Sequence, residues 1–261
     1  MILGVDHIIQ IVRDPLALCA GLRLLPPSSI VSVSGLDHHR VGQLAVFSNT
    51  YVEYCTAESF DQMSPTKHSL QTSSKRLGVI SGRHDAVVAI RVSDADEIAK
   101  RLREGGFLVE GPLYGQADST GFESVIVIPH AKPSSMPLPI FVQRESNPDS
   151  TLEPVDVCKA ANSLQLRNIG VATSNLPQVV ETWAKLLDRR PAESWIQEDL
   201  DAYCVRISLD DHVHIMFCTP VRDGVVSDAL RERGDHVFML NITGSRCQLD
   251  TDIYGMMYRL M

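Results

Sequence analysis

The sequence lacks several features that would assign a chain of 261 residues to a familiar class. No apolar run reaches the roughly 18–20 residues that a membrane span requires, and the N-terminus has no basic region followed by an apolar core. Positive charge is scarce, because 24 Lys and Arg stand against 32 Asp and Glu and leave a net charge of −8. Such a chain has no basic field to attract phosphate backbones or anionic lipid. We therefore expect a cytoplasmic protein with neither nucleic acid nor membrane as a partner.

Closely spaced cysteines are also absent from the sequence. The six cysteines stand singly, mostly within apolar segments and without a CxxC motif: Cys19, Cys55, Cys158, Cys204, Cys218 and Cys247. Scattered thiols are typical of reduced, buried packing residues and not of disulfides or thiolate metal sites. Hydrophobic residues make up 44% of the chain and charged residues 21%, close to the averages for globular domains. The chain is therefore expected to fold as one large domain or two of ordinary size.

The sequence does contain a repeated pattern of predicted elements. The first copy has a strand at 7–13, a helix at 14–25, and strands within 38–49 and 50–59. The second has a strand at 85–94, a helix at 94–106, and strands at 107–113, 122–129 and 137–146. The third has a strand at 166–175, a helix after Asn175, and strands at 202–209 and 212–221. A fourth copy starts at 234–243, and no further strand is expected after it. We interpret the repeated pattern as a βαβββ unit, and the regular spacing of its copies indicates internal repetition.

Helix boundaries and linkers can be placed from local signals. Asp94 and Glu97 have the spacing of a capping box, and Gly105 with Gly106 ends the same predicted helix. Residues 147–162 are rich in Pro, Ser, Asp and Asn and show no apolar period, which is typical of a linker. We therefore expect one domain of two units at 1–146, a linker at 147–162, and one and a half further units at 163–261.

Short motifs on the first and last strands of these units resemble a known superfamily. The motifs are DHI at 6–8, YVEY at 51–54 and LPIFVQ at 138–143, in this order. A paired βαβββ unit with these motifs resembles the vicinal oxygen chelate superfamily, in its glyoxalase-like domain branch. The resemblance implies an α+β fold in which paired units form half-open mixed sheets with helices outside, closing around a divalent metal.

The resemblance also implies which residues hold the metal, since ligands come from the first and last strands of each unit. In the first unit these positions are His7 and Glu53, and in the second the last-strand position is Gln143. The second unit's first-strand position falls on Ala86 or Val87, which cannot ligate. His39 corresponds to a further histidine of the superfamily.

The second half carries weaker versions of the same positions. Its third unit offers only Asn168 and Met216. The Asp-His pair of residues 6 and 7 recurs at Asp235 and His236, where no partner acid follows. One interpretation makes this half a degenerate copy that serves as a dimer surface, which predicts a homodimer.

The chemistry of the first pair suggests a function. A neutral imidazole and a carboxylate suit Zn, Fe, Mn, Ni or Co, and leave coordination positions open for the oxygens of a substrate. We therefore expect a metal-dependent lyase, isomerase or dioxygenase acting on a small oxygen-rich or aromatic substrate, with Glu53 or His39 moving a proton. The alternative is a metal-free protein that binds or sequesters a small molecule on the same fold.

Overall fold

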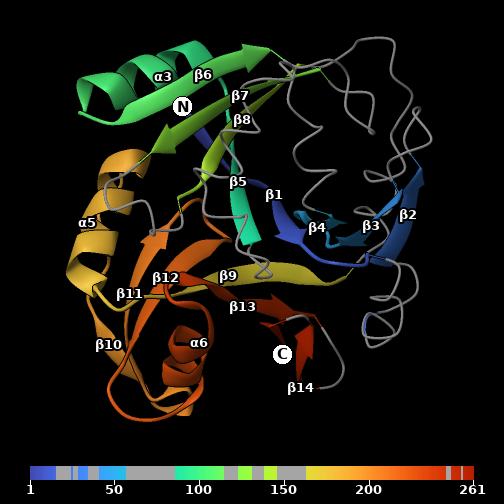
Figure 1. Ribbon diagram of the computed structural model, residues 1–261, viewed down its shortest axis with the longest axis vertical. Coiled ribbons are helices and arrows are strands. Elements are labelled where there is room, and N and C mark those ends of the chain that lie inside the picture. Colours follow the sequence, from blue (N-terminus) through green and yellow to red (C-terminus); the bar gives the residue numbers. More distant parts are fainter. Residues whose placement is uncertain are drawn as a thin grey trace. The chain divides into compact units, whose positions relative to one another are not determined.

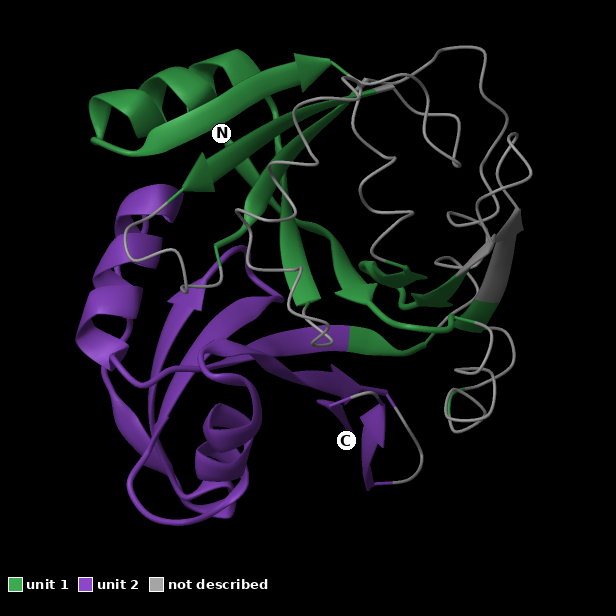
Figure 2. Ribbon diagram, viewed as in Figure 1, with its two compact units in different colours: residues 1–134, 138–165 green, residues 135–137, 166–261 purple. Residues whose placement is uncertain are grey.

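The computed structural model describes residues 1–15, 25, 29–34, 41–56, 86–114, 123–130, 138–145, 163–244, 248–253 and 255–261. The chain divides into two compact units (Figure 2): residues 1–134 with 138–165, and residues 135–137 with 166–261. Each unit contains one open mixed β-sheet, with one described helix packed on the sheet of the first unit and several on that of the second, as Figure 1 shows. The predicted α+β class is therefore confirmed. No helix in the described part of the chain is both long and apolar enough to cross a membrane.

The sheet of unit 1 has eight strands, in the order β2-β3-β4-β1-β5-β8-β7-β6. Their bounds are β1 (Ile2–Ile11), β2 (Ile30–Ser34), β3 (Val41–Val46), β4 (Tyr51–Cys55), β5 (Ala86–Val92), β6 (Leu108–Tyr114), β7 (Glu123–His130) and β8 (Ile140–Glu145). The opening strands β1 and β5 of the two repeats pair antiparallel at the centre. Each also pairs parallel with the last strand of its own repeat, β4 or β8. This arrangement brings both ends of each βαβββ repeat to the middle of one sheet.

The helix of the second repeat, α3 (Ala95–Glu104), confirms the capping signals in the sequence. The Asp94 side chain accepts a hydrogen bond from the backbone N–H of Glu97 at 2.9 Å, and the helix ends at Gly105. Ile98 and Leu102 are buried on the face of α3 that packs against β6, β7 and β8. Figure 1 shows α3 alongside β6. The helix predicted at 14–25 lies almost wholly outside the described residues.

The sheet of unit 2 has seven strands, in the order β10-β11-β12-β9-β13-β15-β14. The strands are β9 (Gln165–Ala172), β10 (Trp195–Gln197), β11 (Ala202–Ser208), β12 (His214–Pro220), β13 (His236–Thr243), β14 (Leu249–Ile253) and β15 (Met256–Leu260). Its helices are α5 (Leu176–Leu187), the short 3₁₀ helix η5 (Glu198–Leu200) and α6 (Val225–Arg233). Helix α5 begins where predicted, since Asn175 accepts a hydrogen bond from Gln178 N at 3.4 Å.

The expectation that no strand follows residues 234–243 is wrong. Strands β14 and β15 form an antiparallel hairpin, and β15 pairs parallel with β13. The hairpin turns at Gly255, whose φ of +77° is a conformation that favours glycine. Unit 2 thus carries the sheet of a second repeat pair.

Gly111 in β6 offers a test of this packing. Its φ is +103°, and a Cβ added there would lie 2.5 Å from the carbonyl oxygen of Ile126 on β7. Gly106, just after α3, also has a positive φ of +86° but nothing within 4 Å of an added Cβ. We expect Gly106→Ala to cost about 1–2 kcal/mol from backbone strain alone, and Gly111→Ala clearly more, because a backbone carbonyl must also move. Thermal unfolding followed by circular dichroism compares the two variants, and equal losses would contradict the clash.

Candidate functional site

The site begins with an irregularity in β1 at Asp6 and His7. Val5 pairs with Ile90 and His7 with Ala89, so Asp6 is one extra residue that has no counterpart on β5. In a regular strand the side chains of neighbouring residues point to opposite faces, whereas a β-bulge re-aims them. Here His7 Nδ1 lies 2.7 Å from Asp6 Oδ1. The bulge therefore allows two consecutive side chains to act as one unit.

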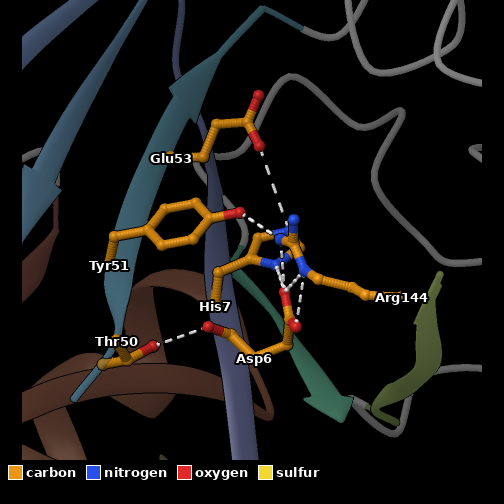
Figure 3. A network of polar contacts seen from close by, with 6 residues as sticks. All are labelled: Asp6, His7, Thr50, Tyr51, Glu53 and Arg144. Carbon is orange, nitrogen blue, oxygen red and sulfur yellow. Dashed lines mark hydrogen bonds and ion pairs between the residues drawn. The ribbon is translucent and has the colours of Figure 1, made fainter. Parts of the chain in front are cut away.

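Asp6 is held by a residue from the far end of the unit's sequence, as Figure 3 shows. Arg144 on β8 donates from Nε to both Asp6 carboxylate oxygens, at 3.0 and 2.8 Å, and from Nη2 to Oδ1 at 2.6 Å. The same Nη2 donates to the hydroxyl of Tyr51 at 2.6 Å. The Tyr51 ring stacks on the His7 ring, with centroids 5.0 Å apart and planes 2° from parallel. The backbone oxygen of Asp6 also accepts from Thr50 Oγ1 at 3.0 Å.

These contacts determine the electronic state of the cluster. Burial alone raises the pKa of the Asp6 carboxyl, but hydrogen bonds from His7 and Arg144 and the charges of these groups outweigh it and hold that pKa well below its ordinary range. A carboxylate can only accept, so His7 Nδ1 carries the hydrogen that bonds to it. In the neutral ring the lone pair is then on Nε2.

The Nε2 side of the His7 ring faces Glu53, as Figure 3 shows. The Nε2 atom lies 3.9 Å from Glu53 Oε2, and the side chains are 8% and 21% exposed. Strand β4 pairs parallel with β1, and Glu53 lies opposite Ile9, so Glu53 and His7 share one face of the sheet. His7 Nε2 is buried and has no hydrogen-bond partner within the described residues. The two first-unit residues predicted to act together are therefore brought together.

The same face of the sheet continues as an apolar cluster. Its buried members are Ile9, Ile11, Cys55, Val87, Ala89, Ile128, Ile140 and Val142. We call this side of the sheet the site face and the side covered by α3 the helix face. Val5 is not part of this cluster, because the bulge at Asp6 lies between Val5 and Ile9. A small molecule held at His7 and Glu53 would have apolar neighbours.

Gln143, expected on the metal, does not join His7 and Glu53. Its Oε1 accepts a hydrogen bond from the backbone N–H of Ala95 at 2.7 Å, at the start of α3. Ile140 and Val142 lie on the site face, so alternation along β8 turns Gln143 to the helix face and Arg144 to the site face. The side chain that β8 contributes to the site is therefore a cation, which sequence reasoning missed.

The remaining predicted residues fall into two groups. His39 lies outside the described residues, so its role stays a prediction. In unit 2, Met216 is buried in an apolar cluster with Cys204 and Cys218, and Asn168 lies opposite His214. The second Asp-His pair does not repeat the first, because Asp235 accepts from Thr173 Oγ1 at 2.6 Å while His236 Nδ1 donates to Gly234 O at 2.8 Å. Burial lowers the pKa of His236.

A divalent metal can be tested against this donor set. A histidine that ligates a metal through one nitrogen commonly donates from the other to a carboxylate, as His7 does to Asp6. Two ligand atoms bound at about 2.1 Å to a tetrahedral ion lie about 3.4 Å apart. His7 Nε2 and Glu53 Oε2 are 3.9 Å apart, and a small rotation of the Glu53 side chain brings them to that separation. Two carboxylates against one guanidinium leave one negative charge at the cluster. The described residues thus fit a cation with two donors, although no three His, Cys, Asp or Glu among them converge.

The Asp6–Arg144 pair makes stability depend on pH. Because the folded-state pKa of Asp6 lies below the unfolded value of about 3.9, its contribution is complete above that value and is lost as the pH falls below it. We expect Asp6→Asn to lower stability at pH 7 by about 3–5 kcal/mol, since it leaves Arg144 buried without its counter-ion. The difference from the unmodified protein should shrink below about pH 4. Urea unfolding between pH 3 and pH 7 measures it.

A matched control uses an exposed ion pair. Glu181 and Lys185 on α5 are 2.7 Å apart, with side chains 68% and 62% exposed. Glu181→Gln should leave the unfolding midpoint almost unchanged at every pH, because water already solvates both charges. A pH-independent loss in Asp6→Asn would show that the carboxylate charge of Asp6 does not stabilise the fold.

Comparison with known proteins yields matches in structure but not in sequence. No family model and no curated protein matches the chain. Among solved structures, a hypothetical protein from Staphylococcus aureus aligns over 100% of this chain and 99% of its own, with a TM-score of 0.69 and 18% identity. A variant of 4-hydroxymandelate synthase from Streptomyces coelicolor aligns over 93% of this chain and 71% of its own, with a TM-score of 0.57 and 13% identity.

A third match is a fusion of a xylose isomerase-like TIM barrel with 4-hydroxyphenylpyruvate dioxygenase. It aligns over 96% of this chain and 37% of its own, with a TM-score of 0.50 and 12% identity. At these identities the likeness is one of fold. The likeness to these structures supports the α+β fold that the sequence motifs indicated, and in this fold the chain presents His7 and Glu53.

Proposed function

We propose that the protein is an enzyme that uses a divalent metal ion, held by His7 and Glu53, to act on a small oxygen-rich or aromatic substrate. The observation that carries this proposal is the approach of His7 Nε2 to Glu53 Oε2, at 3.9 Å, with the other nitrogen of His7 on a buried carboxylate. An imidazole lone pair that faces a carboxylate and has no donor among the residues that the structure describes is a costly arrangement for packing alone. It is a useful one for binding a cation.

Each residue of the cluster has a definite part in this function. Asp6 holds the His7 ring in the tautomer that keeps Nε2 available, and Arg144 keeps Asp6 ionised. Stacking of Tyr51 against His7 restricts rotation of the imidazole ring. Glu53 is the more exposed of the two donors and can move a proton at its carboxylate oxygen. A bound divalent ion would supply Lewis acidity toward substrate oxygens.

The surroundings narrow the kind of substrate. The site face beside His7 is apolar, with Ile9, Val142 and Cys55 in its cluster. A ligand that presents two adjacent oxygens to the metal and an apolar or aromatic body to this cluster fits both parts. His39 is a second candidate for moving a proton. This role rests on the resemblance, because His39 lies outside the described residues.

Metal content of purified protein tests the donor pair. We expect protein that has been stripped and refilled with Zn, Fe(II), Mn, Ni or Co to retain one equivalent of at least one metal. His7→Ala should lose this retention, because a single carboxylate does not hold the ion. Elemental analysis after gel filtration measures the stoichiometry. Turnover of catechols and of 2-oxoaldehyde adducts by loaded and stripped protein then tests the enzymatic part.

His130→Ala is the matched control. His130 Nε2 lies 3.6 Å from Glu110 Oε2 in the same unit, with both side chains similarly buried, so the variant removes a comparable imidazole near a carboxylate. It should retain the metal. If the unmodified protein retains no metal after refilling, or if His130→Ala loses it as completely as His7→Ala, the proposed centre is wrong.

One observation favours a second function, a metal-free protein that binds a small molecule. The helix-face position of Gln143 leaves two donors among the described residues, and two donors give a weak metal site. The stacked rings of Tyr51 and His7 next to an apolar cluster would then form a surface for an aromatic ligand. A protein that stays metal-free after refilling yet binds catechols with unchanged affinity in chelator would establish this function.

A further inference from the structure

Two cysteines that do not belong to the first-unit site lie face to face in unit 2. Cys204 on β11 is directly opposite Cys218 on β12 in the antiparallel register. Their sulfur atoms are 3.3 Å apart, and both residues are fully buried thiols. The sequence predicted reduced, buried cysteines, which is confirmed for these two, but their pairing in space follows only from the register of β11 and β12.

We propose that Cys204 and Cys218 form a two-electron redox site that a peroxide converts into a cross-strand disulfide. The bond requires the sulfurs to approach to about 2.05 Å, which from 3.3 Å is a movement within reach of side-chain rotation. This inference is independent of the metal centre, since none of its residues belongs to that site.

The chemistry can be written with its atoms balanced. The Cys204 sulfur, as a thiolate, attacks one peroxide oxygen, and the O–O bond breaks to give a sulfenic acid and, after protonation, one water. The Cys218 sulfur then attacks the sulfenic sulfur, the S–O bond breaks, and a second water leaves as the disulfide forms. Two thiols are oxidised by two electrons in total, and one hydrogen peroxide is reduced to two waters.

The two sulfurs differ in the direction in which their pKa values are shifted. The hydrogen bond that they share stabilises the thiolate of Cys204 and so lowers its pKa, against the opposing effect of burial. The same hydrogen bond, together with burial, raises the pKa of Cys218. The lowered pKa favours Cys204 as the sulfur that attacks the peroxide first, and the serine variants described below test this order.

Access to this buried pair is controlled by helix α6. Val226 belongs to the same apolar cluster as both cysteines, and Ala229 and Leu230 pack against that cluster. Val226 is the only fully buried residue of α6, whereas α5 buries six residues, including Val179 and Trp183. A nine-residue helix with so little buried surface opens at low cost. Opening of α6 would admit a small oxidant without unfolding the sheet.

Helices α5 and α6 cover opposite faces of the sheet of unit 2. Phe217, the neighbour of Cys218 on β12, contacts Trp183 of α5 edge to face, with ring centroids 5.4 Å apart. Because neighbours along a strand point to opposite faces, Cys218 lies on the other side of the sheet from α5. Substitutions that shorten a buried side chain of α5 or of α6 therefore disturb opposite faces of the sheet. Only the face under α6 carries the two thiols.

Peptide mapping of the full-length protein tests the proposal. Reduced protein is treated with hydrogen peroxide, blocked with an alkylating agent under denaturing conditions, and digested with trypsin. Arg206 separates the two cysteines, so the expected product is a linked pair of peptides, one with Cys204 and one with Cys218. Cys218→Ser should instead trap Cys204 as a sulfenic acid that reacts with dimedone, and Cys204→Ser should leave Cys218 reduced.

Two core truncations supply the test of access. Val226→Ala should accelerate formation of the linked peptides several-fold, because it weakens the packing of α6, whereas Val179→Ala on α5 should not. Linked peptides between other cysteines would overturn the assignment. So would fully reduced Cys204 and Cys218 in both the unmodified protein and Val226→Ala. The unmodified protein gives a decision even if a serine variant fails to fold.

Discussion

The buried ion pair between Asp6 and Arg144 is the interaction on which the candidate site depends. It joins residues 138 positions apart in the sequence, on β1 and β8, and both side chains are almost fully buried. A buried charge is tolerated when it is paired and its remaining hydrogen-bonding capacity is used. Here the carboxylate also accepts from His7, and the guanidinium also donates to Tyr51. The cost of burying two charges is thus offset by contacts that orient the imidazole.

The β-bulge at Asp6 is the backbone feature that makes this possible. Without the extra residue, Asp6 and His7 would point to opposite faces of the sheet and could not form a hydrogen bond to each other through their side chains. The second Asp-His pair shows what the same dipeptide does elsewhere. Asp235 lies just before β13, where Thr173 and Ser174 supply its hydrogen bonds, and His236 bonds to a backbone carbonyl instead. The dipeptide alone therefore does not determine a site.

Most of the fold could be predicted from the sequence, because its signals are local. The caps Asp94 and Asn175 and the apolar stripes behind them place α3 and α5 within a residue or two. Shorter or weaker elements escaped prediction. Strand β10 has only three residues, and α6 fully buries only Val226, so neither shows a clear period.

The candidate site was predictable only in part, because the sequence does not show which residues of β8 point to which face of the sheet. Ile140, Phe141 and Val142 are all buried, so apolar residues occupy both faces and alternation cannot tell which face Gln143 occupies. An error of one residue in this assignment turns a side chain to the opposite face. In the structure Gln143 accepts a hydrogen bond from the start of α3, and its neighbour Arg144 donates to Asp6 at the site. The resemblance led to His7 and Glu53, whereas Arg144 could be assigned only from coordinates.

The two units carry different kinds of side chain on equivalent strands. In unit 1, β1 and β4 carry a histidine and a carboxylate beside a buried ion pair. In unit 2, β12 carries Met216 and Cys218 in a cluster that is apolar apart from its thiols, under α6. A cation needs oxygen or nitrogen donors with compensating charge, while a dithiol needs two sulfurs in register and a cover that excludes water. Repetition of the βαβββ unit thus preserves the pairing of strands and leaves the side chains of one face open to either use.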